Sequence, residues 1–260
     1  MVKKLFDNSK LKSSKYEKYF NVYTKLFSNY IGKEITFVEI GIDDGGSLEV
    51  WKNFFGDKAK IIGIDINPLC KQFENLNENI EVIIGDQSSQ RFWKNFFLNY
   101  GKVDIILDDG GHTNKQQIIT ASEVIPNIND NGLLLVEDTH SSYLKNFNSS
   151  FNLSFVNFCK TLIDDVNFKF SENFQQKNFS LNDYIYSIQF YESFVAFYID
   201  RSLCSYNKKI TNSGLVSDVG NIYRAQQKNK FIKNKFYSLR GLFEIISNFK
   251  TNILLKKYFK

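Results

Sequence analysis

Short apolar runs alternate along the first 200 residues with longer segments that mix apolar and polar positions. Seven of these runs are predicted to be strands: 35–40, 61–64, 80–84, 103–107, 133–136, 184–190 and 194–199. The first five are apolar at almost every position, which indicates strands buried on both faces, as in a parallel sheet. The last two flank the tripeptide Tyr191-Glu192-Ser193 and are predicted to form a β-hairpin that closes the sheet.

The segments between the strands have the pattern of helices that bury one face. Helices are therefore predicted at 14–30, 47–55, 69–76, 89–99, 114–125 and 150–164. Alternation of strand and helix is typical of an α/β fold with a doubly wound, Rossmann-like sheet. The sequence has no internal repeat and no linker rich in Pro or Gly.

Two strand ends carry the most distinctive chemistry of the chain, and they hold its only two histidines. The two runs are Asp108-Asp109-Gly110-Gly111-His112 and Glu137-Asp138-Thr139-His140. Because ligands of such sheets bind at the carboxyl ends of the strands, we expect the four carboxylates and two imidazoles to lie close together. So many acids in one place are costly without a cation, and hard oxygen ligands suit Mg²⁺ or a similar ion. The sequence therefore predicts a divalent metal site.

A glycine-containing turn at 41–47 follows the first strand and differs in spacing from the dinucleotide motif G-x-G-x-x-G. Its two adjacent aspartates would repel a pyrophosphate, whereas S-adenosylmethionine has no phosphate and carries a sulfonium cation. Asp65 ends the second strand about 20 residues after the turn, where an acid can accept hydrogen bonds from ribose hydroxyls. Asp86 and Gln87 follow the third strand and are placed to reach an adenine, although Asp86 before Ser88 can equally be a helix cap.

These positions resemble the motifs of class I S-adenosylmethionine-dependent methyltransferases. More narrowly, the two acidic runs are similar to those of the metal-dependent sugar O-methyltransferases typified by macrocin and mycinamicin O-methyltransferases, and of cephalosporin-hydroxylase-like proteins. The resemblance covers about residues 14–200, and its most specific part is the pair of runs with 28 positions from Asp109 to Glu137. It implies a seven-stranded sheet, mostly parallel, with a C-terminal antiparallel hairpin.

The resemblance also implies a role for each site residue. Asp109, Glu137 and Asp138 would bind Mg²⁺ or Mn²⁺, and His112, together with Asp109, would be catalytic, with His112 as the general base. A sugar hydroxyl is too weak an acid to ionise unaided near neutral pH, and a bound cation with an imidazole base meets that need. The residues expected to bind the cofactor are Glu39, Gly41, Gly45, Ser47, Asp65, Asp86, Gln87 and Asp108, and those expected to contact the substrate are Tyr19, His140 and Tyr143.

Three of these roles stay open at the level of sequence. His140 can support the metal shell or bind substrate, and Tyr143 can simply pack. The role of Tyr19 is the third, because members of the family often carry a histidine just before this position, where this chain has Glu17 and Lys18.

The net charge of +5 hides an asymmetry along the chain. Residues 201–260 hold 13 Lys or Arg against two acids, so they carry +11 and the first 200 residues carry −6. We expect a methyltransferase domain at 1–200 followed by a basic, helical extension at 201–260. A solvated extension that packs a subunit contact in a homo-oligomer is favoured over one that binds an anionic polymer. No groove of interleaved basic and aromatic residues lies near the motifs, so a nucleic-acid partner is not expected.

Cysteine usage and hydropathy indicate a cytoplasmic protein. Cys70, Cys159 and Cys204 show no metal or redox spacing and suit a reducing compartment. The N-terminus has no apolar core of a signal peptide, and no segment is long enough to span a bilayer.

The predicted activity is methyl transfer from S-adenosylmethionine to a sugar hydroxyl. The expected acceptor is a small sugar or a nucleotide-linked sugar destined for a capsule or other surface polysaccharide, with a capsular heptose as one candidate. Methylation of a catechol or natural-product hydroxyl is the first alternative, and an inactive, methyltransferase-like binding module is the second. An NAD-linked oxidoreductase is disfavoured by the spacing and acidity of the glycine turn.

Overall fold

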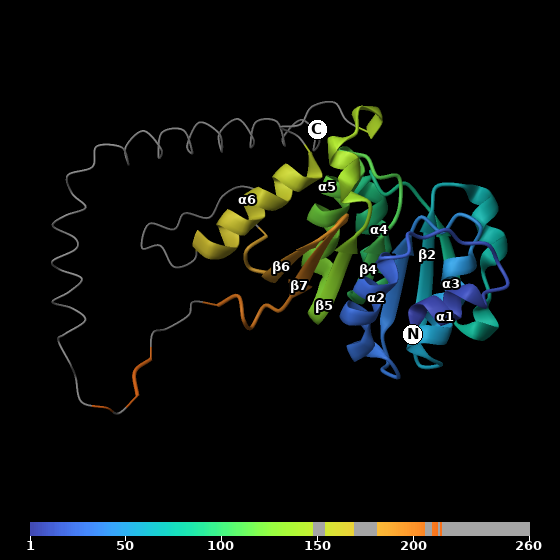
Figure 1. Cartoon of the computed structure of the whole chain (residues 1–260), viewed down its shortest axis with the longest axis horizontal. Helices are drawn as coiled ribbons and strands as arrows, with labels where there is room; N and C mark the ends of the chain where they lie inside the picture. Colours follow the sequence, from blue (N-terminus) through green and yellow to red (C-terminus); the bar gives the residue numbers. More distant parts are fainter. Residues whose placement is uncertain (148–153, 169–180, 206–209, 213, 215–260) are drawn as a thin grey trace. The chain divides into compact units, whose positions relative to one another are not determined.

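The computed structural model describes residues 1–147, 154–168, 181–205, 210–212 and 214. Within these residues seven strands form one sheet in the order β3-β2-β1-β4-β5-β7-β6 (Figure 1). The strands are β1 Thr36–Ile40, β2 Lys60–Asp65, β3 Ile80–Ile84, β4 Val103–Asp108, β5 Ile128–Val136, β6 Ile185–Tyr191 and β7 Phe194–Ile199. Strands β1 to β5 pair in parallel, and β7 is antiparallel to both β5 and β6. The predicted doubly wound sheet with a C-terminal hairpin is confirmed.

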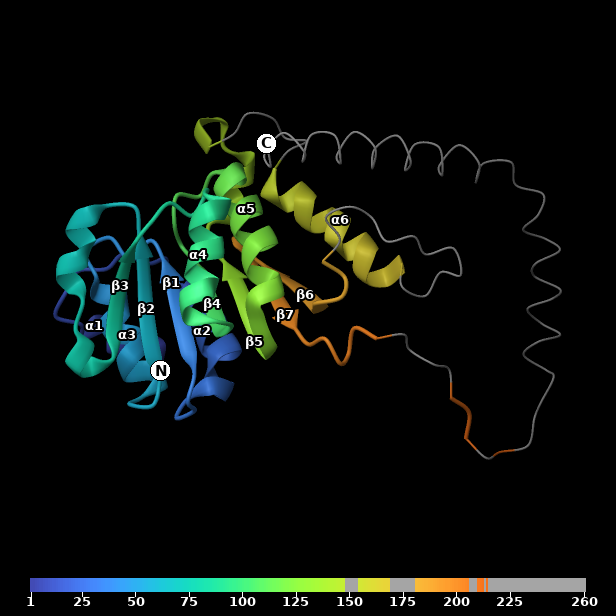
Figure 2. The same ribbon diagram turned by 180° about the vertical axis from the view of Figure 1, so that it is seen from behind.

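Helices cover both faces of the sheet (Figures 1 and 2). The α-helices are α1 Val2–Asp7, α2 Tyr19–Phe27, α3 Gly46–Phe55, α4 Gln90–Tyr100, α5 Asn114–Val124 and α6 Phe155–Phe168. Helices α1, α2 and α3 share one face, and α4, α5 and α6 lie on the other. Short 3-10 turns connect these elements: η1 Ser28–Tyr30, η2 Pro68–Phe73, η3 Leu76–Glu78, η4 Ile125–Asn127, η5 Thr139–Tyr143 and η6 Lys145–Phe147.

An aromatic core joins α2 and α3 to the sheet. Phe37 of β1 is fully buried and packs against Trp51 of α3, with ring centroids 5.3 Å apart. Phe27 of α2 and Phe55 of α3 complete the cluster around the same strand. Burial of such rings is a large part of the hydrophobic stabilisation of a domain, so this core fixes α2 and the chain before it against the sheet.

The helix prediction for residues 14–30 is wrong at its start. The α-helix begins only at Tyr19, and residues 12–16 are irregular. The physical reason is the side chain of Lys15, which leaves the helical pattern to pair with carboxylates at the end of the sheet. The spacing of apolar residues carries no information about ion pairs with distant residues. The helix predicted from that spacing therefore began too early.

Other boundaries also differ from the predictions. The predicted helix at 69–76 is wrong, since η2 ends at Phe73 and η3 begins only at Leu76; Pro68 begins a short 3-10 turn capped by the Asn67 side chain. The six-residue helix α1 was not predicted. Contacts within the chain divide it after Ser205. Most of the predicted helical extension at 201–260 lies outside the described residues, so both the extension and its boundary stay predictions.

In the described part of the chain, no helix has both the length and the apolar character that a membrane crossing needs.

Candidate active site

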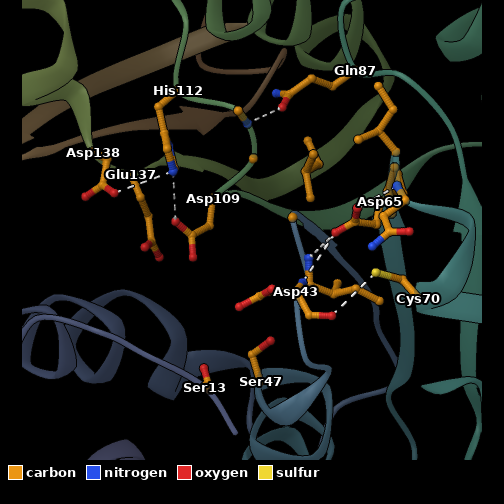
Figure 3. A pocket seen from close by; sticks show the side chains of 18 of the residues that line it. Ser13, Asp43, Ser47, Asp65, Cys70, Gln87, Asp109, His112, Glu137 and Asp138 are labelled. Atoms are coloured by element: carbon orange, nitrogen blue, oxygen red, sulfur yellow. Dashed lines mark hydrogen bonds and ion pairs between the residues drawn. The ribbon is translucent and has the colours of Figure 1, made fainter. Parts of the chain in front are cut away.

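A pocket of about 650 Å³ opens at the carboxyl ends of the parallel strands. Residues that follow β1, β2 and β3 line one part of it, which we name the β1–β3 half, and residues that follow β4 and β5 line the other, the β4–β5 half. Residues 12–16, here named the N-terminal segment, complete the wall. Figure 3 shows Asp65 and Cys70 in the first half and Asp109, His112 and Asp138 in the second. The motifs that the sequence singled out therefore meet in one cavity, at the edge where doubly wound sheets bind ligands.

Asp65 organises the β1–β3 half. Its Oδ2 accepts hydrogen bonds from the backbone N–H groups of Ile42 at 3.0 Å and Asp43 at 3.3 Å, and its Oδ1 accepts one from Asn67 at 2.9 Å. A carboxylate has about four acceptor sites, so lone-pair capacity remains for a ligand hydroxyl. Asp65 thus fixes the glycine turn to the end of β2 and still presents an acceptor to the pocket.

Gly41 lets the ends of β1 and β4 approach each other. Its φ is +82°, and a Cβ built there would lie 2.3 Å from the backbone oxygen of Asp109. Any larger residue would be strained and would push the two halves of the pocket apart.

The predicted cofactor residues divide into two sets. Those that line the pocket are Gly41, Ser47, Asp65, Asp86 and Gln87, and those that do not are Glu39, Gly45 and Asp108. Gly45 instead caps the start of α3 with a left-handed φ of +74°.

Asp108 is turned away from the cavity. Its buried carboxylate accepts hydrogen bonds from Gln87 Nε2 at 2.9 Å and from the backbone of Gly110 at 3.2 Å, and burial raises its pKa to about 6. Gln87 also accepts a hydrogen bond from Gly111 N–H through Oε1 at 2.8 Å. These two side chains therefore fix the loop that leads to His112.

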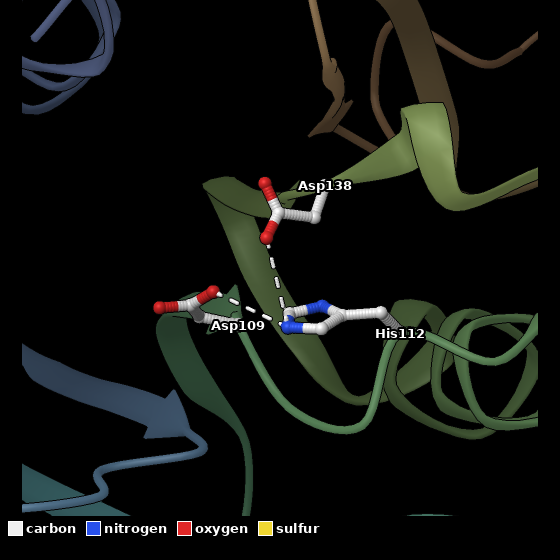
Figure 4. Close-up of side chains that lie close together, drawn as sticks. All are labelled: Asp109, His112 and Asp138. Carbon is white, nitrogen blue, oxygen red and sulfur yellow. Dashed lines mark ion pairs between the residues drawn. The ribbon is translucent and has the colours of Figure 1, made fainter. Parts of the chain in front are cut away.

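Three side chains of the β4–β5 half converge on one point (Figure 4). One ligand atom from each of Asp109, His112 and Asp138 lies within 4.8 Å of the others. His112 Nε2 is 3.6 Å from Asp138 Oδ2 and 3.9 Å from Asp109 Oδ1. Both His112 and Asp138 have positive φ angles, of 56° and 53°. Such strained backbone in residues other than glycine is typical of functional sites.

Glu137 differs from these three because its carboxylate is buried. Tyr23 OH donates a hydrogen bond to Glu137 Oε1 at 2.5 Å, and Lys15 Nζ lies 3.3 Å from Oε2. Burial raises the pKa of Glu137, and the charge of Lys15 opposes that rise. Both oxygens of the predicted third ligand are therefore engaged by residues of the chain itself.

Lys15 is a residue of the site that the sequence analysis missed. Its ammonium, in a side chain only 6% exposed, pairs with Asp109, lies 3.3 Å from Glu137 and is 3.9 Å from Glu39. Burial alone would lower the pKa of Lys15, but these three carboxylates raise it, so the ammonium stays charged. The expectation of a cation among the acids could have pointed to a basic side chain in the site. Nothing in the sequence pattern, however, distinguished Lys15 from the other Lys and Arg residues, which number 33 in all.

Glu39 lies beneath this ion pair, inside β1. Its carboxyl is fully buried and accepts a hydrogen bond from Ser47 Oγ at 2.6 Å. Burial raises its pKa to about 7, while Lys15 and Ser47 oppose the shift. Glu39 therefore lies outside the pocket lining and is linked to the site through Lys15.

A polar network borders the outer side of the β4–β5 half. Tyr19 OH donates a hydrogen bond to Asp138 and lies 2.8 Å from Ser193 Oγ, which in turn is 2.5 Å from His140 Nδ1. Ser193 sits in the turn between β6 and β7 with a φ of +69°, and it was not predicted. Of the three predicted substrate residues, Tyr19 lines the pocket, whereas His140 and Tyr143 lie outside its lining, and Tyr143 is 61% exposed.

The donor set of the β4–β5 half fits a divalent ion. The carboxylates of Asp109 and Asp138 are the hard oxygen ligands that Mg²⁺ and Mn²⁺ prefer, and their oxygens lie close to the His112 imidazole. Asp109 and Asp138 are each about one-fifth exposed, so an ion can reach them from the pocket. Glu137 would join this set only after leaving Lys15.

The relatives found by sequence comparison are all named as O-methyltransferases. No protein-family model matches the chain. It is 30% identical over 158 residues to the 8-demethyl-8-alpha-L-rhamnosyl tetracenomycin-C 2'-O-methyltransferase of Streptomyces olivaceus, covering 57% of this chain and 41% of that protein. It is 29% identical to the demethylmacrocin O-methyltransferase of Streptomyces fradiae (55% of this chain, 38% of that one) and 31% identical to the mycinamicin VI 2''-O-methyltransferase of Micromonospora griseorubida (48% and 32%). The chain thus spans about two-fifths or less of the length of these relatives.

Solved structures agree at the level of the fold. A structure of the MycE methyltransferase from the mycinamycin biosynthetic pathway, in complex with Mg and SAH, superposes with a TM-score of 0.67 at 23% identity, covering 80% of this chain and 54% of that one. A MycE complex that also holds mycinamycin VI superposes with a TM-score of 0.64 and covers 79% and 54%. The chain therefore has the fold of the class I S-adenosylmethionine-dependent methyltransferases and is related in sequence to sugar O-methyltransferases.

Proposed function

We propose that this chain transfers a methyl group from S-adenosylmethionine to a sugar hydroxyl with the help of a divalent ion. One observation carries the proposal: a single pocket is lined both by Asp65 and the glycine turn and by Asp109, His112 and Asp138. The first group suits a nucleoside with a positive sulfonium, and the second suits an ion and a proton acceptor. The names of the relatives support the acceptor class, since each is an O-methyltransferase of a sugar-bearing product.

The β1–β3 half would hold the cofactor. Asp65 would accept a hydrogen bond from a ribose hydroxyl through the acceptor site that its three backbone donors leave. Asp86 and Gln87 would border the base, and Ser47 would line the wall beside the glycine turn. Bound in this way, S-adenosylmethionine supplies an activated methyl group, and the role of these residues is to hold it in place.

In the β4–β5 half, Asp109 and Asp138 would hold Mg²⁺ or Mn²⁺, with Glu137 as a third ligand. The ion supplies positive charge beside the acceptor oxygen. His112 would accept the proton of the acceptor hydroxyl at Nε2, which is the nitrogen that faces Asp109 and Asp138. The two carboxylates would then stabilise the imidazolium.

The lining of the pocket favours a sugar over a catechol. Around the acidic cluster the wall consists of polar side chains, among them Lys15, Tyr19 and Gln116, rather than an apolar slot for a ring. We further propose that the acceptor is a nucleotide-linked sugar of a surface polysaccharide, such as a capsular heptose. The charge of +11 on residues 201–260 supports an anionic acceptor of this kind.

The test is transfer of a labelled methyl group. The chain would be incubated with labelled S-adenosylmethionine, Mg²⁺ and a panel of free, glycosidic and nucleotide-linked sugars, and the products would be analysed by mass spectrometry. We expect transfer to a sugar hydroxyl that excess chelator abolishes and added Mg²⁺ restores. Absence of transfer to every hydroxyl would contradict the function, and full activity in excess chelator would remove the ion from it.

A further inference from the structure

The ammonium group of Lys15 lies among the carboxylates of the candidate metal site. The Lys15 ammonium contacts Asp109, lies 3.3 Å from Glu137 Oε2 and is 3.9 Å from Glu39 Oε1. Glu39 lies in β1, and Asp109 and Glu137 directly follow β4 and β5, which are neighbouring strands of the sheet. Lys15 is thus a shared counter-charge for acids that would otherwise repel one another across the floor of the pocket.

The oxygens that hold Lys15 are among those that a divalent ion needs. In the proposed function, on which this inference rests, the ion binds Asp109 and Glu137 as well as Asp138. Carboxylate oxygens bind Mg²⁺ at about 2.0–2.1 Å, so an ion bound to Asp109 and Glu137 would occupy the space that Lys15 Nζ fills between them. Two cations that close, in a site largely removed from water, repel each other strongly.

We propose that Lys15 and the divalent ion compete for Asp109 and Glu137. Lys15 neutralises the acids before the ion arrives, and the ion takes its place by displacing the ammonium. Binding of the ion and docking of Lys15 therefore exclude each other, and by linkage each weakens the other by the same factor.

The competition extends to the wall of the pocket because Lys15 belongs to the N-terminal segment. The chain just before this segment is fixed independently of Lys15, since Ser9 Oγ donates to the backbone oxygen of Gly46 at 3.2 Å and Gly46 N–H donates to Lys12 O at 3.3 Å. Between that anchor and Tyr19, where α2 begins, Lys15 ties the segment to the pocket floor. Displacement of Lys15 would therefore release residues 13–16 from the pocket and leave both flanks in place.

The first test is calorimetric titration of the metal-free, full-length chain with Mn²⁺, without cofactor or acceptor. We expect Lys15→Gln to bind Mn²⁺ about tenfold or more tightly than the wild type. Lys18→Gln is the matched control, because Lys18 is a nearby lysine, 78% exposed, that pairs with Glu192 and not with the acidic cluster. It should bind Mn²⁺ as the wild type does. Equal or weaker binding by Lys15→Gln, or no binding by either protein, would overturn the proposal.

The second test rests on the wild type with and without Mn²⁺, so its deciding comparison does not depend on the folding of a variant. Chymotrypsin cleavage after Tyr16, followed by mass spectrometry, reports on the freedom of residues 13–16, and this site is present in both the wild type and Lys15→Gln. We expect Mn²⁺ to accelerate cleavage of the wild type, whereas Lys15→Gln should be cleaved quickly with or without the ion. Cleavage of the wild type that Mn²⁺ leaves unchanged would count against release of the segment and so against the competition.

These experiments separate the inference from the proposed function. Neither titration nor proteolysis involves methyl transfer, so competition can be present in a chain that methylates no sugar. Conversely, sugar methylation combined with equal Mn²⁺ affinity in the wild type and Lys15→Gln would retain the function and remove Lys15 as the competitor.

Discussion

The β1–β3 half of the pocket is held by short-range hydrogen bonds, whereas the β4–β5 half is held by charges that meet from distant parts of the chain. Asp65 binds backbone groups up to 23 positions away. Lys15 and Asp109 are 94 positions apart, and Tyr23 and Glu137 are 114 apart. A site built from neighbouring turns can be recognised from a motif, but one completed by a distant side chain cannot. The difference also separates binding from chemistry, because the local half suits a cofactor and the long-range half suits proton removal.

The largest expected effect is the loss of the proton acceptor in the β4–β5 half. His112→Ala should lower turnover by about 10²–10⁴-fold, the usual contribution of a general base, and leave affinity for S-adenosylhomocysteine unchanged. Steady-state kinetics and calorimetry measure the two quantities. His140→Ala is the control, because His140 lies outside the pocket lining and should cost less turnover. Equal losses of turnover and cofactor affinity would mean that the two halves are not separate.

The second effect concerns the buried acid below the site. Glu39 has a folded-state pKa of about 7, raised by burial from 4.5. Between these values the folded state binds more protons than the unfolded state, so the contribution of Glu39 to stability falls as pH rises from about 4.5 to about 7. Gln does not titrate, so the unfolding free energy of Glu39→Gln relative to the wild type should rise by up to about 3 kcal/mol over this window. Denaturant titrations of the metal-free protein at several pH values measure it, and a pH-independent difference would contradict a shifted Glu39.

The fold was predictable because its signals are local. The five apolar runs identified β1 to β5, and the polar turn at Glu192 and Ser193 identified the hairpin of β6 and β7. The number of strands and their mostly parallel arrangement followed from the resemblance, whereas strand order and register were not predicted. The start of α2 was missed because Lys15, which lies before the helix, forms ion pairs with carboxylates at the ends of distant strands.

The acidic residues of the candidate site could be predicted from the sequence, but the residue that pairs with them could not. Four carboxylates at neighbouring strand ends need a cation on electrostatic grounds, and the divalent ion predicted to meet that need stays a prediction. The structure meets part of that need with Lys15, a residue without any local motif. Ser193 could not be predicted from the sequence either, because its contact with Tyr19 forms only when the hairpin packs against α2.

A smaller effect is expected from the acceptor of the β1–β3 half. Asp65→Ala should weaken binding of S-adenosylhomocysteine by about tenfold or more, since hydrogen bonds to a charged group contribute about 1.5–3 kcal/mol. Calorimetry with the cofactor product measures it. Asp44→Ala is the control, because Asp44 pairs with exposed Lys12 at 3.7 Å and does not line the pocket. Equal weakening in both variants would indicate a general effect of acidic charge instead of ribose binding.

The smallest effect should come from the outer network of the β4–β5 half. Ser193→Ala removes a hydroxyl that lies 2.8 Å from Tyr19 OH and 2.5 Å from His140 Nδ1. Neutral hydrogen bonds of this kind contribute about 0.5–1.5 kcal/mol, so KM for the acceptor should rise by a few-fold to about tenfold with kcat nearly kept. Tyr19→Phe should raise KM by a larger factor, because it also removes the hydrogen bond to the Asp138 carboxylate, and the double variant should show less than the product of the two effects, because both act through one network. A fully multiplicative result would mean that Tyr19 and Ser193 contact the acceptor independently. The long-range half would then be a set of separate contacts rather than a connected network.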